Sequence, residues 1–250
     1  MRRSVDGSER PFRLGILVCD HVEGDELLAA SAGADYPDMY DRLLRPVMSQ
    51  LTVRTYDVVN EEVPVSVDEC DGWLITGSRW DAYRDEPWLI GLRAFVEQLW
   101  LSKSRTVGVC FGHQVVAHAL GGAVEPTGEW KLGPQEMSVD ATPWFGGGDV
   151  WLHAMHQDAV ATLPPEALDV ATGTTASHPM FIVGDSMLCL QDHPEFNSTY
   201  TSALIAIRRQ KMGDDVARDG LTRAANIPTD GPTVAAWIAA FLLDERSAIS

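Results

Sequence analysis

The segment that most constrains the fold of this chain covers residues 105–122, RTVGVCFGHQVVAHALGG. Its apolar start predicts a short buried strand, and the helical spacing of the apolar residues that follow predicts a helix ending at Gly121 and Gly122. Cys110 lies where the strand passes into the helix, flanked by glycines that allow a sharp turn. A helix N-terminus places backbone N–H groups and a positive partial charge beside it, which favours a thiolate. The local sequence therefore marks Cys110 as a candidate nucleophile.

A second segment, QDHPE at residues 191–195, could supply the base that a cysteine nucleophile needs. In an extended segment His193 and Glu195 project from the same side of the chain, and Pro194 keeps the backbone stiff. A carboxylate fixes the tautomer and orientation of an adjacent imidazole, which can then accept a proton from a thiol. We therefore expect Cys110, His193 and Glu195 to form a catalytic triad if the fold brings residue 110 to residue 193.

Together these motifs resemble the class I glutamine amidotransferase family. The family pattern G-x-C-x-G-x-Q is found here from Gly108 to Gln114, and the later H-P-E motif begins at His193. The resemblance runs from about Leu14 to about Ala206. It implies a flavodoxin-like α/β fold of three layers, in which a mostly parallel open sheet carries helices on both faces. It also implies hydrolysis of a γ-glutamyl amide bond through a glutamyl thioester on Cys110.

The resemblance further implies an oxyanion hole. One donor would be the backbone N–H of Phe111, and the other would be that of Gly77 or Ser78, in the turn after the apolar stretch at residues 71–75. The usual turn in the family is Gly-Gly-Pro, whereas this chain has Gly-Ser-Arg. With this Gly-Ser-Arg turn, the chain resembles a subgroup of the family that contains γ-glutamyl peptidases and stand-alone amidotransferase-like proteins.

By the same resemblance, two parts of the chain would bind the glutamyl group. They are Gln114 and the segment at residues 155–158, which corresponds to the family's S-H-x-D and contributes Met155, His156 and Asp158. Met155 replaces the serine, so a backbone contact to substrate could be kept but a hydroxyl contact could not. The role of Arg79 stays open, and Trp80, Tyr83 and Trp130 are candidates for the walls of the pocket.

Metal and cofactor sites are not expected. His153, His156 and Asp158 are loosely spaced and lack a further strong ligand, whereas a zinc site needs a closed set of nitrogen or sulfur ligands. The glycine pairs and triplets do not match the phosphate-binding pattern G-x-x-x-x-G-K-[ST]. We therefore predict no metal and no cofactor.

The charge and the cysteines of the chain limit which partners and which cellular location we expect. Nineteen Lys and Arg residues against 36 Asp and Glu give a net charge of −17, which argues against nucleic acid and against anionic membranes as partners. The cysteines at 19, 70, 110 and 189 are widely spaced and form no C-x-x-C pair. Together with a start that is unlike a signal peptide, they predict a cytoplasmic protein with reduced thiols.

The length of 250 residues suits one α/β domain, which we place at residues 12–250 after a polar tail at 1–11. A polar loop at residues 20–34 follows the first strand and is a candidate rim of the site. The remaining apolar patterns predict strands at 12–19, 51–59, 71–75, 124–139 (as hairpin strands), 167–171 and 180–184, and helices at 36–48, 86–101, 197–212 and 232–245.

The identity of the leaving group separates the possible functions. If it is ammonia, the chain is a glutaminase that should feed a separate synthase subunit. If it is a larger amine or amino acid, the chain is a γ-glutamyl peptidase or hydrolase that acts alone. The missing ATP motif and the Gly-Ser-Arg turn favour the second. A non-catalytic binding or regulatory subunit is the alternative of another class, and an intact triad speaks against it.

Overall fold

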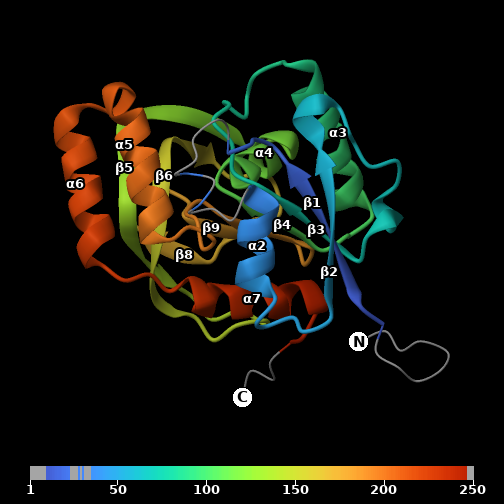
Figure 1. The fold of residues 1–250 in the computed structure, drawn as a ribbon. Helices are drawn as coiled ribbons and strands as arrows, with labels where there is room; N and C mark the ends of the chain where they lie inside the picture. The colour runs from blue at the N-terminus through green and yellow to red at the C-terminus, as the bar shows by residue number, and fades with distance from the viewer. Residues whose placement is uncertain (1–9, 23–27, 29, 31–34, 247–250) are drawn as a thin grey trace.

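A seven-stranded sheet forms the centre of the computed structural model, which describes residues 10–22, 28, 30 and 35–246 (Figure 1). The strand order is β2-β1-β3-β4-β10-β9-β7. The first five strands in this order run parallel, and β9 runs antiparallel to both of its neighbours. The strands are β1 (Phe12–Val18), β2 (Leu51–Asp57), β3 (Gly72–Ile75), β4 (Thr106–Val109), β7 (Ala167–Asp169), β9 (Met180–Val183) and β10 (Met187–Leu190).

Helices cover both faces of this sheet. One face packs against α3 (Pro87–Leu101) and α4 (Phe111–Ala119), and the other against α2 (Tyr36–Leu44) and α7 (Gly231–Leu243). Along β1, Leu14 and Ile16 face α2 and α7 while Leu17 faces the opposite core, as the period of two in a strand requires. The predicted three-layer α/β fold with a mostly parallel sheet is confirmed.

A second, antiparallel sheet lies beside the first and was not predicted. It has the order β6-β5-β8 and consists of β5 (Ala123–Val139), β6 (Gly148–Thr162) and β8 (Ala171–Gly173). On its outer side pack α5 (Ser198–Met212) and α6 (Asp214–Asn226) (Figure 1).

The prediction of hairpin strands within residues 124–139 was wrong, because β5 is one strand and its hairpin partner is β6. β5 contains Pro126 and Pro134. Because β8 pairs only with residues 137–139 of β5, both prolines lie where β5 has a partner on one side alone. Proline is tolerated in such edge positions. The strand is also irregular there, with a register shift between Pro126 and Lys131.

Helix α6 was also missed, because its buried face carries only small residues, Ala217, Gly220 and Ala224. Elsewhere the ends of elements moved: the helix predicted at 36–48 ends at Leu44, the strand predicted at 51–59 ends at Asp57, and the segment 167–171 is divided between β7 and β8. The other predicted strands and helices are confirmed within a few residues.

Parts of two predictions lie outside the described residues: most of the polar tail at 1–11 and most of the rim loop at 20–34. The assignment of residues 12–250 to a single domain stays a prediction. No helix in the described part of the chain combines the length and the apolar character needed to cross a membrane.

Candidate active site

Cys110 lies at the turn from β4 into α4, at the carboxyl edge of the parallel strands. Its φ of 52° is unusual for a residue other than glycine, and its N–H donates to the carbonyl of Leu190 at 2.8 Å. The flanking glycines are required by close backbone approach. A Cβ on Gly108 would lie 2.6 Å from the oxygen of Gly112, and one on Gly112 would lie 2.3 Å from the oxygen of Ile75. The G-x-C-x-G pattern therefore holds a strained, 4% exposed cysteine at this turn.

His193 is fixed on several sides. Its backbone N–H donates to the carbonyl of His153 at 2.9 Å, and its Nδ1 donates to Glu195 Oε1 at 2.7 Å. The imidazole stacks on Phe196, with 3.8 Å between the ring centroids and an interplanar angle of 6°. Gly77 also packs against the ring, because a Cβ at this position would lie 2.7 Å from Cε1 of His193. The imidazole therefore has little freedom to turn.

The fold brings residue 110 to residue 193, because Cys110 and Glu195 both lie near enough to the His193 imidazole to change its pKa. Burial works against charge on the imidazole, but the neighbouring Glu195 and Cys110 outweigh it and raise the pKa of His193 to about 10. The ring is therefore protonated at neutral pH. An imidazolium beside a cysteine sulfur is the arrangement that favours a thiolate in cysteine hydrolases.

Tyr40 completes the surroundings of the carboxylate. Its hydroxyl donates to Glu195 Oε1 at 2.9 Å, the same oxygen that accepts from His193. Burial, and next the charge of Glu195, raise the pKa of Tyr40 above its usual value, so this hydroxyl keeps its proton and acts as a donor. No sequence motif pointed to Tyr40, because α2 is far from the H-P-E segment along the chain.

Two buried glutamines connect Cys110 to the second sheet. Gln191 Nε2 lies 3.8 Å from Cys110 Sγ, and Gln191 Oε1 accepts from Gln114 Nε2 at 3.3 Å. Gln114 Nε2 also donates to the carbonyl of Asp158 at 2.9 Å. Gln114 was predicted to contact substrate, and its amide group already supports the wall of the pocket. Gln191 was not predicted, although it belongs to the segment that carries His193.

The three residues of the predicted oxyanion hole lie around the nucleophile. Phe111 is the first residue of α4, so its N–H has no partner within the helix. Ser78 lines the same pocket as Cys110, while Gly77 contacts the imidazole from behind. Their roles as oxyanion donors stay predictions.

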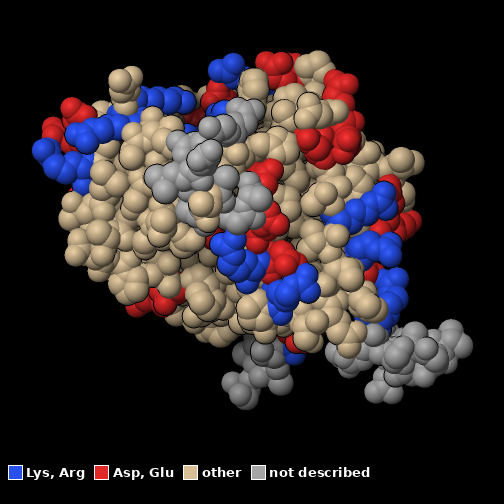
Figure 2. Space-filling view, viewed as in Figure 1, with Lys and Arg blue, Asp and Glu red and all other residues tan. Residues whose placement is uncertain are grey.

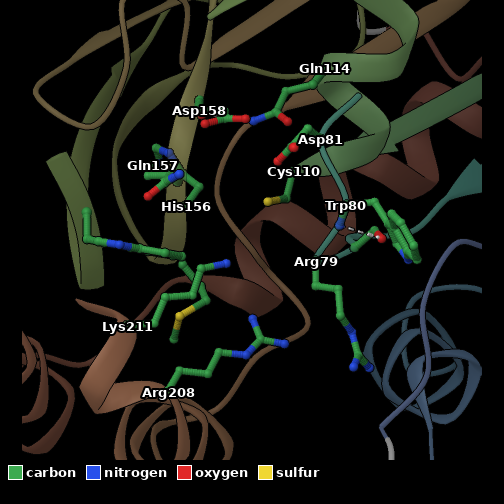
Figure 3. A pocket seen from close by; sticks show the side chains of 13 residues that line it. Arg79, Trp80, Asp81, Cys110, Gln114, His156, Gln157, Asp158, Arg208 and Lys211 are labelled. Atoms are coloured by element: carbon green, nitrogen blue, oxygen red, sulfur yellow. Dashed lines mark hydrogen bonds between the residues drawn. The ribbon is translucent and has the colours of Figure 1, made fainter. Parts of the chain in front are cut away.

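An open pocket of about 320 Å³ adjoins the sulfur of Cys110 (Figure 3). Of the predicted residues, its lining includes Ser78, Gln114, Met155, His156 and Asp158, as well as Arg79 and two of the three candidate wall residues, Trp80 and Trp130. The third, Tyr83, is not among the residues that line this pocket, although Asp158 lies near enough to influence its pKa. The lining also contains Gln157, which lies within the predicted segment 155–158, and three residues that were not predicted: Asp81, Arg208 and Lys211.

The side chains considered as metal ligands have other surroundings. His156 Nε2 lies 3.2 Å from Asp192 Oδ1, and both atoms are within hydrogen-bond distance of the Thr175 hydroxyl. Burial, and next the neighbouring His193, lower the pKa of His153 to about 4, so that ring is neutral. Within the ranges that the structure describes, no three His, Cys, Asp or Glu side chains are gathered as a metal site would require.

Comparisons with known proteins agree on one family. The family model for the glutamine amidotransferase class-I domain matches residues 32–208. The chain is 33% identical to gamma-glutamyl peptidase 3 of Arabidopsis thaliana over 141 residues, which is 52% of this chain and 57% of the plant protein. It is 31% identical to gamma-glutamyl peptidase 5 of the same plant over 188 residues, which is 70% of this chain and 75% of that protein.

Among solved structures, the fold resembles that of a glutamine amido transferase from Methylobacillus flagellatus. The TM-score is 0.71, with 96% of each chain covered and 16% sequence identity, so this likeness concerns the fold alone. The alignment with gamma-glutamyl peptidase 3 spans little more than half of that relative's length.

Proposed function

The chain belongs to the class I glutamine amidotransferase family, and on this premise we propose that it is a γ-glutamyl peptidase, a hydrolase that cleaves γ-glutamyl amides through Cys110. The observation that carries this proposal is the arrangement around His193, which is hydrogen-bonded to Glu195 and has Cys110 as a neighbour that raises its pKa. A nucleophile, a base and an orienting carboxylate in this order are the parts that covalent acyl transfer needs.

In the first half of the reaction, Cys110 Sγ attacks the γ-carbonyl carbon, and the carbonyl electron pair moves onto oxygen. The N–H groups of Phe111 and of Ser78 or Gly77 hold this oxyanion, and loss of one such donor typically costs ~3 kcal/mol. When the tetrahedral intermediate collapses, the C–N bond breaks and the leaving nitrogen takes a proton from His193. A glutamyl thioester remains on Cys110.

In the second half, His193 accepts a proton from water, and the resulting hydroxide attacks the thioester carbon. The C–S bond breaks, glutamate leaves, and the thiolate and imidazolium are restored. Glu195 orients the imidazole throughout, and Tyr40 and Phe196 hold this pair in position. Neither step requires a metal or a cofactor.

Two plant relatives that are named gamma-glutamyl peptidases support a leaving group larger than ammonia. The pocket supports it as well, because it is open and extends beyond Cys110 to residues of α5. A glutaminase that supplies ammonia to a separate synthase subunit is the second candidate, favoured by the match to the glutamine amidotransferase class-I family model. The non-catalytic alternative has no support from a site in which Cys110 and the His193–Glu195 pair lie together. A cytoplasmic location and the absence of nucleic-acid and membrane partners stay predictions.

Glutamate release from a panel of amides tests the proposal. The purified protein is incubated with glutamine, γ-glutamyl-alanine and its isomer α-glutamyl-alanine. We expect kcat/KM for γ-glutamyl-alanine to exceed that for glutamine by about tenfold or more, because the larger leaving group adds contacts in the pocket, and we expect no cleavage of the α-isomer. Turnover of glutamine alone would identify an ammonia donor. No turnover of any compound would contradict the hydrolase proposal.

A methyl group added at Gly77 tests the placement of His193. In Gly77→Ala the new Cβ would lie 2.7 Å from Cε1 of the imidazole, so the ring must shift. We expect kcat/KM to fall about 100-fold, the effect typical of displacing a catalytic group by about 1 Å. Gly91→Ala is the matched control, since its nearest contact is Val63 Cγ2 at 3.9 Å. A Gly77→Ala variant with the melting temperature and the activity of wild type would show that the ring is not held there.

A further inference from the structure

The pocket beside Cys110 carries opposite charges on its two sides. Figure 3 shows Asp81 and Asp158 on one side of the Cys110 sulfur and Arg208 and Lys211 on the other. The basic pair is notable because the whole chain has a net charge of −17. A ligand that fits this pocket should therefore be positive at one end and negative at the other.

The basic side comes from one face of α5. Arg208 and Lys211 are three residues apart in this helix, so they lie on the same face. Arg208 is half-buried and forms no ion pair with any residue that the structure describes. Lys211 Nζ lies 5.5 Å from the ring centroid of Trp130, which holds the ammonium group over the pocket wall. In Figure 3 both side chains extend toward Cys110.

The other arginines near this helix and this pocket are already paired. Arg209 donates to Asp214 at 2.6 Å, and Arg79 is bonded to Asp20 at 2.8 Å. In Figure 3 Arg79 leads away from the sulfur. Figure 2 shows Lys and Arg side chains mixed with Asp and Glu side chains over the upper ends of α5 and α6, where Arg209 pairs with Asp214 and Arg218 with Asp215.

The acidic side suits an ammonium group. Asp158 is buried, its Oδ1 has no hydrogen-bond partner, and Asp81 lines the same pocket. Burial, and next the charge of Asp81, raise the pKa of Asp158, which a bound cation would relieve. In a γ-glutamyl substrate the α-ammonium and α-carboxylate share one carbon. An ammonium held by Asp158 therefore keeps its own carboxylate on this side, and the cations across the sulfur are left for the other half of the substrate.

We propose that Arg208 and Lys211 form a subsite for a carboxylate on the leaving group, which makes γ-glutamyl amino acids and peptides with a free carboxyl end the preferred substrates. This inference rests on the proposed peptidase function and assigns the specificity of the same site. It gives Arg208 and Lys211 a role in binding, with no part in proton transfer. It also separates this pocket from one built for glutamine, whose leaving group carries no charge that Arg208 could bind.

A pair of substrates that differ only at this carboxylate tests the subsite. kcat/KM is measured for γ-glutamyl-alanine and for γ-glutamyl-alaninamide, with wild type, Arg208→Gln and Lys211→Gln. We expect wild type to prefer the acid by about tenfold or more, as a charge-assisted hydrogen bond provides. In Arg208→Gln this ratio should fall toward one, mainly through KM, and Lys211→Gln should lower it by a smaller factor. Arg209→Gln, on the same helix but paired to Asp214, should keep the wild-type ratio.

Two results would overturn the subsite. One is a wild-type enzyme that cleaves acid and amide equally well. The other is an equal loss for both substrates in Arg208→Gln, which would show that the arginine binds the glutamyl half. If neither compound is cleaved, the peptidase proposal fails, and calorimetry with the Cys110→Ala protein decides the subsite separately. Tighter binding of the acid would support it, and equal binding would contradict it.

Discussion

Replacement of Cys110 by alanine is expected to lower the release of glutamate from γ-glutamyl amides by about 10⁴-fold or more, the scale seen when a covalent nucleophile is removed. The reason is that Cys110 is the only cysteine among the described residues that line the pocket, and the thioester intermediate needs its sulfur. The fold should survive, because the glycines on either side, and not the sulfur, accommodate the turn. Initial rates of glutamate release, together with a thermal melt, measure both effects.

Cys70→Ala is the matched control for this variant. Cys70 is a free cysteine, half-buried and absent from the pocket lining. Its loss should leave the rate near that of wild type. A Cys110→Ala protein that keeps more than a few percent of wild-type activity would refute covalent catalysis by this residue, whatever its substrate.

Replacement of His193 by alanine should have the second largest effect, a loss of about 10³- to 10⁴-fold in kcat. The imidazole has to protonate the leaving nitrogen and then activate water, so both half-reactions slow down. The effect should be greater on kcat than on KM, since the imidazole acts in proton transfer and is not needed to bind the substrate. Steady-state kinetics with γ-glutamyl-alanine give the two constants separately.

His118→Ala provides the comparison, because His118 is half-buried at the far end of α4 from Cys110. We expect its kcat to stay within about twofold of wild type, as is usual for changes away from a site. If His193→Ala retained kcat within tenfold of wild type, another group would have to act as the base. The arrangement of His193, Glu195 and Tyr40 would then be structural.

The nucleophile and its partner could be located from the sequence because each lies in a segment with its own local pattern. The strand, the two glycines and the helix around Cys110 are neighbours along the chain, and so are His193 and Glu195. Individual strands and helices could be predicted for the same reason, since the apolar run of β1 and the helical spacing in α3 are both local signals. That these two segments meet in the fold was predicted from the family resemblance.

The rest of the site depends on contacts between distant parts of the chain, which local patterns do not report. Tyr40 meets Glu195 across 155 positions, and no periodicity in α2 marks its hydroxyl as different from any other. Arg208 and Lys211 resemble ordinary surface residues of a helix until β5 and β6 are placed opposite them. The second sheet depends on the pairing of β5 with β6 and β8, which local patterns also do not report. For the basic side of the pocket, the sequence offered one signal, a pair of basic residues on one face of the helix that follows H-P-E.

Helix α5 starts three residues beyond Glu195, capped by Asn197, so one short connection links the base to the helix that faces the substrate. Natural variation on the exposed side of that helix could therefore redirect the choice of amide while the cysteine and its glycines stay untouched. Within this single stretch of the chain, the residues of α5 that select the substrate would then change faster than His193 and Glu195, which carry the acid–base chemistry. Relatives that share the cysteine turn but differ along this helix would be the place to find new specificities.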